Sequence, residues 1–200
     1  MSMTIELLAP AKNLECGIEA IRHGADAVYI DAPKYGARAA AGNSLDDLRQ
    51  LAEFAHLYGA RVYVTLNTII YDDELAEVER LLENPPQGVA RFYGVGEIGL
   101  DLYWSRDWQA EQTEAFRAQL DMALKHNLPI VVHTRDAWEE MAAIIEEYRD
   151  KGLRGIFHAF SSDIAMYERL REYGDFLFGI GGVVTFKKSA LAEVVKAMRL

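Results

Sequence analysis

The sequence predicts an α/β protein of the TIM type, a (β/α) barrel with seven recognisable βα units that is incomplete or recombined. Short runs of β-branched and aromatic residues alternate with longer amphipathic segments along all 200 residues, which is typical of a parallel sheet. Each βα unit occupies about 25 to 30 residues, the spacing of a (β/α)₈ barrel. We recognise no eighth unit, and a doubly wound sheet is the alternative.

Each expected strand is a short apolar run, and each is followed by a segment with helical periodicity. The strands are expected at residues 5–8, 27–30, 61–66, 92–97, 130–133, 155–158 and 176–180. The helices are expected at residues 13–23, 44–58, 73–82, 108–126, 137–150, 162–173 and 189–198. Ser44-Leu-Asp-Asp and Ser162-Asp place capping side chains ahead of apolar periodicity. Pro85 and Pro86 end the third helix and form the only linker-like break.

Composition favours a soluble intracellular protein. Half of the residues are hydrophobic, which is enough for one ordinary globular domain spanning residues 1–200. Cys16 is the only cysteine, so no internal disulfide or thiolate zinc cluster can form, and a reducing cytoplasm fits best. The sequence has neither a signal peptide nor a membrane-spanning apolar stretch. A net charge of −10 opposes electrostatic capture of long nucleic acid.

Three consecutive strands are expected to end in side chains that bind metals. Glu97 ends the fourth strand, His133 the fifth, and His158 the sixth. In a barrel, the carboxyl ends of the strands converge on one rim. Two imidazoles and a carboxylate are a common ligand set for Zn²⁺ and other divalent ions. The alternatives are that Glu97 is a turn residue and that each histidine is a hydrogen-bonded core residue.

Further polar residues lie in the loops above this expected site. Asp101, Arg135 and Asp136 are placed to support the ligands or to contact phosphate. The alternative for Asp136 is a helix cap, and for Arg135 it is a surface ion pair. The other three histidines, His23, His56 and His126, fall near the ends of helices, where a cation favours the helix dipole, and are interpreted as structural.

The second part of the chain, residues 91–200, resembles the TatD family of metal-dependent deoxyribonucleases. The resemblance is carried by GEIGLDLYW, LPIVVHTRDAW, FHAFSS and FGIGGVVTFK, which stand in the family's order and spacing. It implies a barrel hydrolase that cleaves phosphodiesters with one or two divalent metals, Zn²⁺ or Mg²⁺/Mn²⁺. By this resemblance, Glu97 is the carboxylate shared by two metals and is the expected catalytic residue. His133 and His158 are then the other ligands of one metal.

The first part, residues 5–82, resembles a different family, the collagenase-like peptidases numbered thirty-two among those of unassigned mechanism. The resemblance is carried by ELLAPAKNLECGIEAIRHGADAVYI, YGARAAAGN and VYVTLNTIIYDDEL. That family's later cysteine-bearing signature is missing. The chain therefore resembles a chimera of two barrel families, with three βα units in residues 1–83, a seam in ENPPQGVAR, and units four to seven in residues 89–200.

The resemblance also implies that the metal site is incomplete. TatD proteins carry an HxH or HxD pair on strand one and an Asp on strand eight, whereas strand one here reads IELLAPA and strand eight is not recognised. We expect weak or no hydrolysis of DNA or of a small phosphodiester. One alternative is a catalytically silent barrel scaffold, and a second is a peptidase or RNA-modification module formed by the first part. Free strand edges predict self-association.

Overall fold

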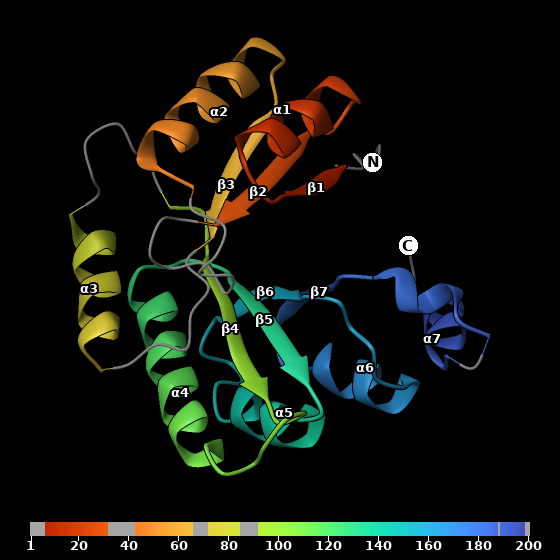
Figure 1. Ribbon diagram of the computed structural model, residues 1–200. Coiled ribbons are helices and arrows are strands. Elements are labelled where there is room, and N and C mark those ends of the chain that lie inside the picture. The colour runs from red at the N-terminus through yellow and green to blue at the C-terminus, as the bar shows by residue number, and fades with distance from the viewer. Residues whose placement is uncertain (1–6, 32–42, 66–71, 85–91, 188, 199–200) are drawn as a thin grey trace. The chain divides into compact units, whose positions relative to one another are not determined.

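The computed structural model describes residues 7–31, 43–65, 72–84, 92–187 and 189–198 (Figure 1). Contacts divide the chain into two compact units, Met1–Ile69 and Ile70–Leu200. The expected seam at residues 83–91 lies mostly outside the described residues. The division into residues 1–83 and 89–200 that the sequence predicts stays a prediction. The third helix, which was expected in the first of these parts, packs within the second compact unit.

The first unit is a three-stranded parallel sheet with two helices. Its elements are β1 (Leu8–Ala11), α1 (Leu14–Arg22), β2 (Ala27–Asp31), α2 (Leu45–Leu57) and β3 (Arg61–Thr65). The strands lie in the order β1-β2-β3. Helices α1 and α2 pack on each other and on the strands. Val28, Ile30 and Leu51 are fully buried at the centre of this small core.

Side-chain caps fix where both helices of the first unit begin. The Asn13 carboxamide oxygen accepts a 2.9 Å hydrogen bond from the backbone N–H of Cys16 at the start of α1. Ser44 and Asp47 form a reciprocal capping box at the start of α2, which confirms the predicted cap. Gly24 and Gly59 follow the two helices with positive φ angles of 95° and 68°, a conformation that glycine adopts without strain.

The second unit continues the same βα repeat. Its elements are α3 (Asp72–Glu83), β4 (Val95–Asp101), α4 (Gln109–Lys125), β5 (Ile130–Arg135), α5 (Trp138–Glu146), β6 (Arg154–Phe157), α6 (Ile164–Leu170), β7 (Asp175–Phe178), a short 3₁₀ helix (Gly182–Thr185) and α7 (Leu191–Ala197). The four strands are parallel in the order β4-β5-β6-β7. All seven predicted strand–helix pairs are therefore present. Self-association through the outer strands stays a prediction.

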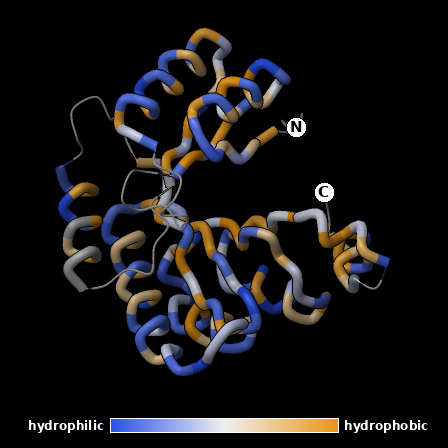
Figure 2. The backbone as a smooth tube through the Cα atoms, in the orientation of Figure 1, coloured by the Kyte–Doolittle hydropathy of each residue, from blue (hydrophilic) through white to orange (hydrophobic). Residues whose placement is uncertain are grey.

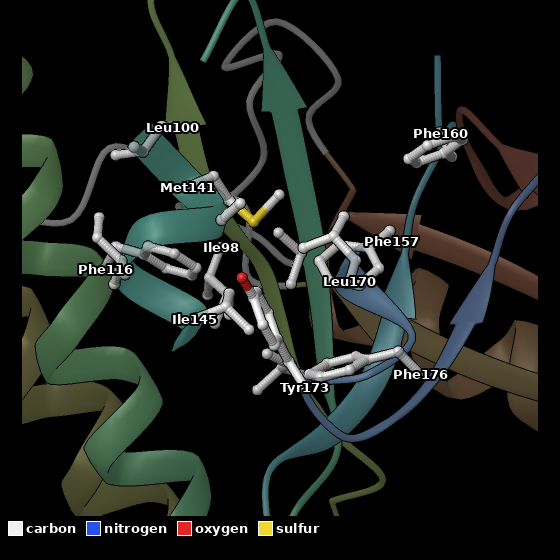
Figure 3. Packing of buried hydrophobic residues seen from close by; sticks show 14 of the residues in the cluster. Ile98, Leu100, Phe116, Met141, Ile145, Phe157, Phe160, Leu170, Tyr173 and Phe176 are labelled. Atoms are coloured by element: carbon white, nitrogen blue, oxygen red, sulfur yellow. The ribbon is translucent and has the colours of Figure 1, made fainter. Parts of the chain in front are cut away.

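The core of the second unit lies between its sheet and the helices. Phe116, Met141 and Ile145 on the helices bury their side chains in one cluster with Ile98 and Leu100 of β4 (Figure 3). Leu120 of α4 is fully buried in the same cluster. An aromatic group fills the space beside β6 and β7, and its members are Trp138, Phe157, Phe160, Tyr167, Phe176 and Phe178. Figure 2 shows hydrophobic and hydrophilic residues alternating around α2 and α4, as expected of helices that cover one face of a sheet.

Two strands differ from their predicted bounds by three residues or more, and the fifth strand continues past His133 to Arg135. The first strand was expected at residues 5–8 but β1 covers Leu8–Ala11; residues 5 and 6 lie outside the described part. The fourth strand was expected to end at Glu97, and this was wrong, because β4 runs from Val95 to Asp101. The position of Glu97 between Gly96 and Gly99 is compatible with a turn, whereas pairing with β5 holds residues 98–101 in the sheet. No helix in the described ranges is long and apolar enough to span a membrane.

Tyr148, which follows α5, makes the stability of the second unit sensitive to alkaline pH. Its side chain is buried, and its hydroxyl donates a 3.3 Å hydrogen bond to the Arg117 carbonyl. Burial first, and then the acidic side chains of Asp121 and Glu147, raise the pKa of Tyr148 to about 12. In the unfolded chain the same phenol ionises near pH 10, its ordinary pKa. The free energy of unfolding should therefore fall as the pH rises from 10 to 12, where the unfolded state loses this proton before the folded state does.

Urea unfolding at pH 9 and pH 11 checks this expectation. The unmodified protein should lose more stability over this interval than the Tyr148→Phe variant, which has no phenol to ionise at this position. An equal loss in both proteins would contradict a role for Tyr148.

Candidate metal centre

Four polar side chains share one face of the sheet formed by β4, β5 and β6. Side chains alternate between the two faces of a strand. The core face is occupied by Ile98, Leu100, Val132 and Phe157, which are buried beneath the helices. The residues between or next to them, Glu97, Asp101, His133 and His158, therefore project from the opposite face.

A β-bulge in β4 determines the position of Glu97. Gly96 pairs with Val131 and Ile98 pairs with Val132, so Glu97 is the extra residue between two consecutive partners. Bulges of this kind redirect one side chain while the rest of the strand keeps its pairing. Here the bulge allows both Val95 and Ile98 to face the core and leaves Glu97 on the polar face.

The two glycines beside Glu97 allow β4 to approach β5 closely. A Cβ atom on Gly96 would lie 2.5 Å from Val131 Cβ, and one on Gly99 would lie 2.0 Å from the His133 carbonyl oxygen. Gly99 also has a φ angle of +136°, which residues with a side chain rarely adopt. The glycines of the GEIG sequence thus bring the backbone that carries Glu97 against the backbone that carries His133.

The four polar side chains form two pairs of an imidazole and a carboxylate. His158 Nε2 lies 3.4 Å from a Glu97 carboxylate oxygen, and His133 Nε2 lies 3.4 Å from Asp101 Oδ2. Glu97 is the least exposed of the four, at 21% of its side chain, whereas the other three are 37–40% exposed. Each pair therefore offers oxygen and nitrogen donors to a ligand that approaches from solvent.

This arrangement differs from the predicted set of three ligands in one respect. Glu97 and His158 come together as expected, but the imidazole of His133 faces Asp101, a residue predicted only to support the site. Asp101 takes this place because β4 extends to it. Glu97, His133 and His158 as one ligand set remain a prediction, and Asp101 is a fourth candidate donor.

Gln112 on α4 holds the end of β4 in place. Its side-chain oxygen accepts a 2.9 Å hydrogen bond from the Asp101 backbone N–H, and its amide nitrogen donates a 3.1 Å bond to the Asp101 carbonyl. Asp101 Oδ1 accepts a further bond from the Tyr103 N–H. Gln112 was not predicted from the sequence, because a glutamine inside an amphipathic helix carries no local signal of such a contact.

Aromatic and basic residues follow the carboxyl ends of β4 and β5. The guanidinium carbon of Arg135 lies 3.6 Å from the ring centroid of Tyr103 and 5.9 Å from that of Trp104. Arg135 thus stacks on aromatic rings, a contact not anticipated from the sequence. Trp104 and Trp108 are 82% and 64% exposed, which is unusual for side chains of this size.

Asp136 is exposed and has a positive φ angle of 52°. Its backbone carbonyl accepts a 3.3 Å bond from Arg106. The N-cap of α5 is Ala137, with no side-chain hydrogen bond, so the alternative that Asp136 caps this helix was wrong. A role for Asp136 in supporting the ligands remains a prediction.

The donor set fits a divalent metal in its chemistry. Imidazole nitrogens and carboxylate oxygens suit Zn²⁺ and Mn²⁺, and carboxylates alone suit Mg²⁺. In each pair, Nε2 of the histidine is directed at a carboxylate oxygen, so both donor atoms face the same space. Each pair could therefore contribute ligands to an ion, but among the described residues no three of these four side chains have donor atoms within 4.8 Å of one another.

Comparison with known proteins identifies the family of the chain. The family described as TatD related DNase has a model that matches residues 25–200. The chain belongs to this family. The TatD-family assignment covers all of β4 to β7 and reaches back into the first unit.

Individual relatives of this TatD-family chain are of two kinds. The chain is 30% identical to the uncharacterized metal-dependent hydrolase YabD of Bacillus subtilis over 151 residues, 74% of this chain and 57% of YabD. It is 56% identical to the 23S rRNA 5-hydroxycytidine C2501 synthase of Escherichia coli over 81 residues, 40% of this chain and 12% of the synthase. The chain thus spans less than two thirds of either relative.

A solved structure supports the TIM-type fold class. The crystal structure of YjjV, a TatD homologue from Escherichia coli K12, matches 92% of this chain and 68% of that protein with a TM-score of 0.71 at 22% identity. At this identity the likeness shows the fold. The TIM-type α/β class predicted from the βα repeat is confirmed by this likeness to TatD structures, and the seven parallel strands agree with it.

Proposed function

We propose that this chain is a metal-dependent hydrolase of phosphodiester bonds whose metal site is incomplete, so that its activity is weak. The observation that supports this most strongly is the pairing of Glu97 with His158 and of Asp101 with His133 on one sheet face, in a chain of the TatD family. A bound divalent ion would polarise a phosphoryl oxygen and acidify a water molecule.

The incompleteness is proposed from β1. In TatD proteins the first strand supplies two further ligands, as the resemblance implies, but β1 here reads Leu-Ala-Pro-Ala and has no imidazole or carboxylate. The two imidazole–carboxylate pairs that remain each supply one nitrogen and one oxygen donor for a single ion. A single ion stabilises the attacking and leaving oxygens less well than two, which is why we expect slow hydrolysis.

The aromatic and basic residues beside the site support a nucleic-acid substrate with unpaired bases, such as a DNA end. Exposed rings on Tyr103, Trp104 and Trp108 offer stacking surfaces that accept any base. Arg135 is held by its face against Tyr103, which leaves the N–H donors in its plane available for a phosphate. These aromatic and basic side chains would bind nucleic acid locally despite the net charge of −10 on the chain. A small phosphodiester, which needs no stacking surface, is the alternative substrate for the same metal-dependent hydrolysis.

Cleavage of a labelled single-stranded oligonucleotide tests the proposal. With Mn²⁺, Mg²⁺ or Zn²⁺ added, we expect slow cleavage that a chelator abolishes. Glu97→Gln should reduce the rate to that of a reaction without protein, because the amide lacks the charge to hold the ion. The matched control is Glu111→Gln, an exposed position in the first turn of α4, which should cleave normally. Cleavage that survives the chelator would contradict the proposal, and no cleavage with any metal would favour a silent scaffold.

A second candidate function follows from the relative that modifies RNA. The chain is 56% identical to the rRNA hydroxycytidine synthase over 81 residues, which favours an RNA-modification activity as the second candidate. On this view the first part is an RNA-modification module. Its activity would survive replacement of His133 and His158, whereas the proposed hydrolysis would not.

A further inference from the structure

A second group of metal-ligating side chains lies on helices α3 and α4, apart from the polar sheet face. Glu79 and Glu83 are one turn apart on α3, and His126 follows the last residue of α4. One donor atom from each residue lies within 4.8 Å of the other two. Among the described residues this is the only group of three or more histidine, cysteine or acidic side chains that is so close. We call it the α3–α4 cluster.

The imidazole of His126 is an independent sign of a ligand. Its Nε2 atom is shielded from solvent and has no hydrogen-bond partner in the part of the chain that the structure describes. A shielded polar nitrogen without a partner is unfavourable. One imidazole nitrogen of His126 also lies within 4.8 Å of an oxygen from each of the two negatively charged carboxylates. A cation placed between the three side chains would satisfy the nitrogen and both carboxylates at once.

The ammonium group of Lys125 already provides a cation at the two carboxylates. Its Nζ atom lies 2.5 Å from a Glu79 oxygen and 2.9 Å from a Glu83 oxygen. The hydrogen bond from Lys125 holds the pKa of Glu83 below its usual range. Like charges four residues apart on a helix repel, so this pair of glutamates requires a positive partner. Lys125 leaves the Nε2 atom of His126 without one.

We propose that Glu79, Glu83 and His126 form a binding site for a divalent transition metal such as Zn²⁺, and that Lys125 competes with the metal for the two carboxylates. Zn²⁺ binds mixed sets of imidazole and carboxylate donors at about 2.0 to 2.2 Å, so donors within 4.8 Å of one another need only small side-chain movements. The Lys125 side chain is 54% exposed and can turn into solvent on its flexible stem. The bound ion would link α3 to α4.

This site is independent of the proposed hydrolase, and the experiment keeps the two apart. All proteins carry His133→Ala and His158→Ala, which removes two imidazoles of the candidate metal centre. Zn²⁺ is titrated by calorimetry into this background, into the background with Lys125→Met, and into the background with both Lys125→Met and His126→Gln. Lys196→Met is the matched control, because Lys196 pairs with Glu193 on α7, and Glu193 belongs to no group of three donors among the described residues.

Removal of the competing ammonium should raise the Zn²⁺ affinity about tenfold. Adding His126→Gln should then lower the affinity by at least a similar factor, while Lys196→Met leaves it unchanged. Zn²⁺ should also raise the melting temperature of the Lys125→Met protein more than that of the background, because the ion binds only the folded helix pair.

The proposal is overturned if Lys125→Met binds Zn²⁺ no more tightly than the background, or if His126→Gln leaves that binding intact. Melting curves without metal show whether each variant is folded. If the double-histidine background does not fold, the same series is made in the unmodified chain. The tighter site must then appear with Lys125→Met and disappear with His126→Gln.

Discussion

Replacing Gly99 with alanine is expected to destabilise the second unit by roughly 4 kcal/mol or more, among the largest effects of a single substitution. The new Cβ atom would lie 2.0 Å from the carbonyl oxygen of His133. That oxygen belongs to the backbone of the neighbouring strand and cannot turn aside, so β4 and β5 would have to separate. The positive φ angle of +136° adds strain. Urea unfolding followed by circular dichroism measures the loss.

Gly152→Ala is the matched control within the same unit. Gly152 also has a positive φ angle, +85°, but a Cβ atom there would meet nothing within 4 Å. Its replacement should cost only about 1 kcal/mol, the conformational term alone. Equal stability of the two alanine variants would show that β4 and β5 are not in the close contact described here.

The repeat of the fold was predictable because each βα unit carries its own local pattern. Alternating apolar runs predicted that seven strands and seven helices exist, although the first and fourth strands were placed about three residues too early, and the Ser44 capping box fixed the start of α2. The end of β4 was not predictable. The two glycines around Ile98 suggested a turn, but they serve a close approach between strands, which depends on the partner strand rather than on the local sequence.

The sequence predicted the main residues of the candidate site, but it did not predict which carboxylate lies beside each histidine. The positions of Glu97, His133 and His158 on consecutive strands placed them on one face of the sheet. The partner of His133 follows from the length of β4, which brings Asp101 to it. The contacts of Gln112 with the Asp101 backbone depend on how α4 packs, and no spacing in the sequence signals them.

Replacing both His133 and His158 with alanine is expected to remove the metal from the candidate centre. Each histidine supplies the nitrogen of one imidazole–carboxylate pair. The carboxylates of Glu97 and Asp101 would remain, but without nitrogen donors they bind Zn²⁺ far more weakly. We expect a loss of affinity on the order of 100-fold or more, with little change in stability, because both imidazoles are 39–40% exposed.

The most direct test of the account is a calorimetric Zn²⁺ titration of this double variant beside the unmodified centre. Both proteins carry Glu83→Gln, which keeps the α3–α4 cluster out of the measurement. We expect the protein with His133 and His158 to bind one Zn²⁺ ion tightly and the double variant not to bind it. Equal Zn²⁺ affinity in the two proteins would contradict the assignment of this sheet face as a metal centre.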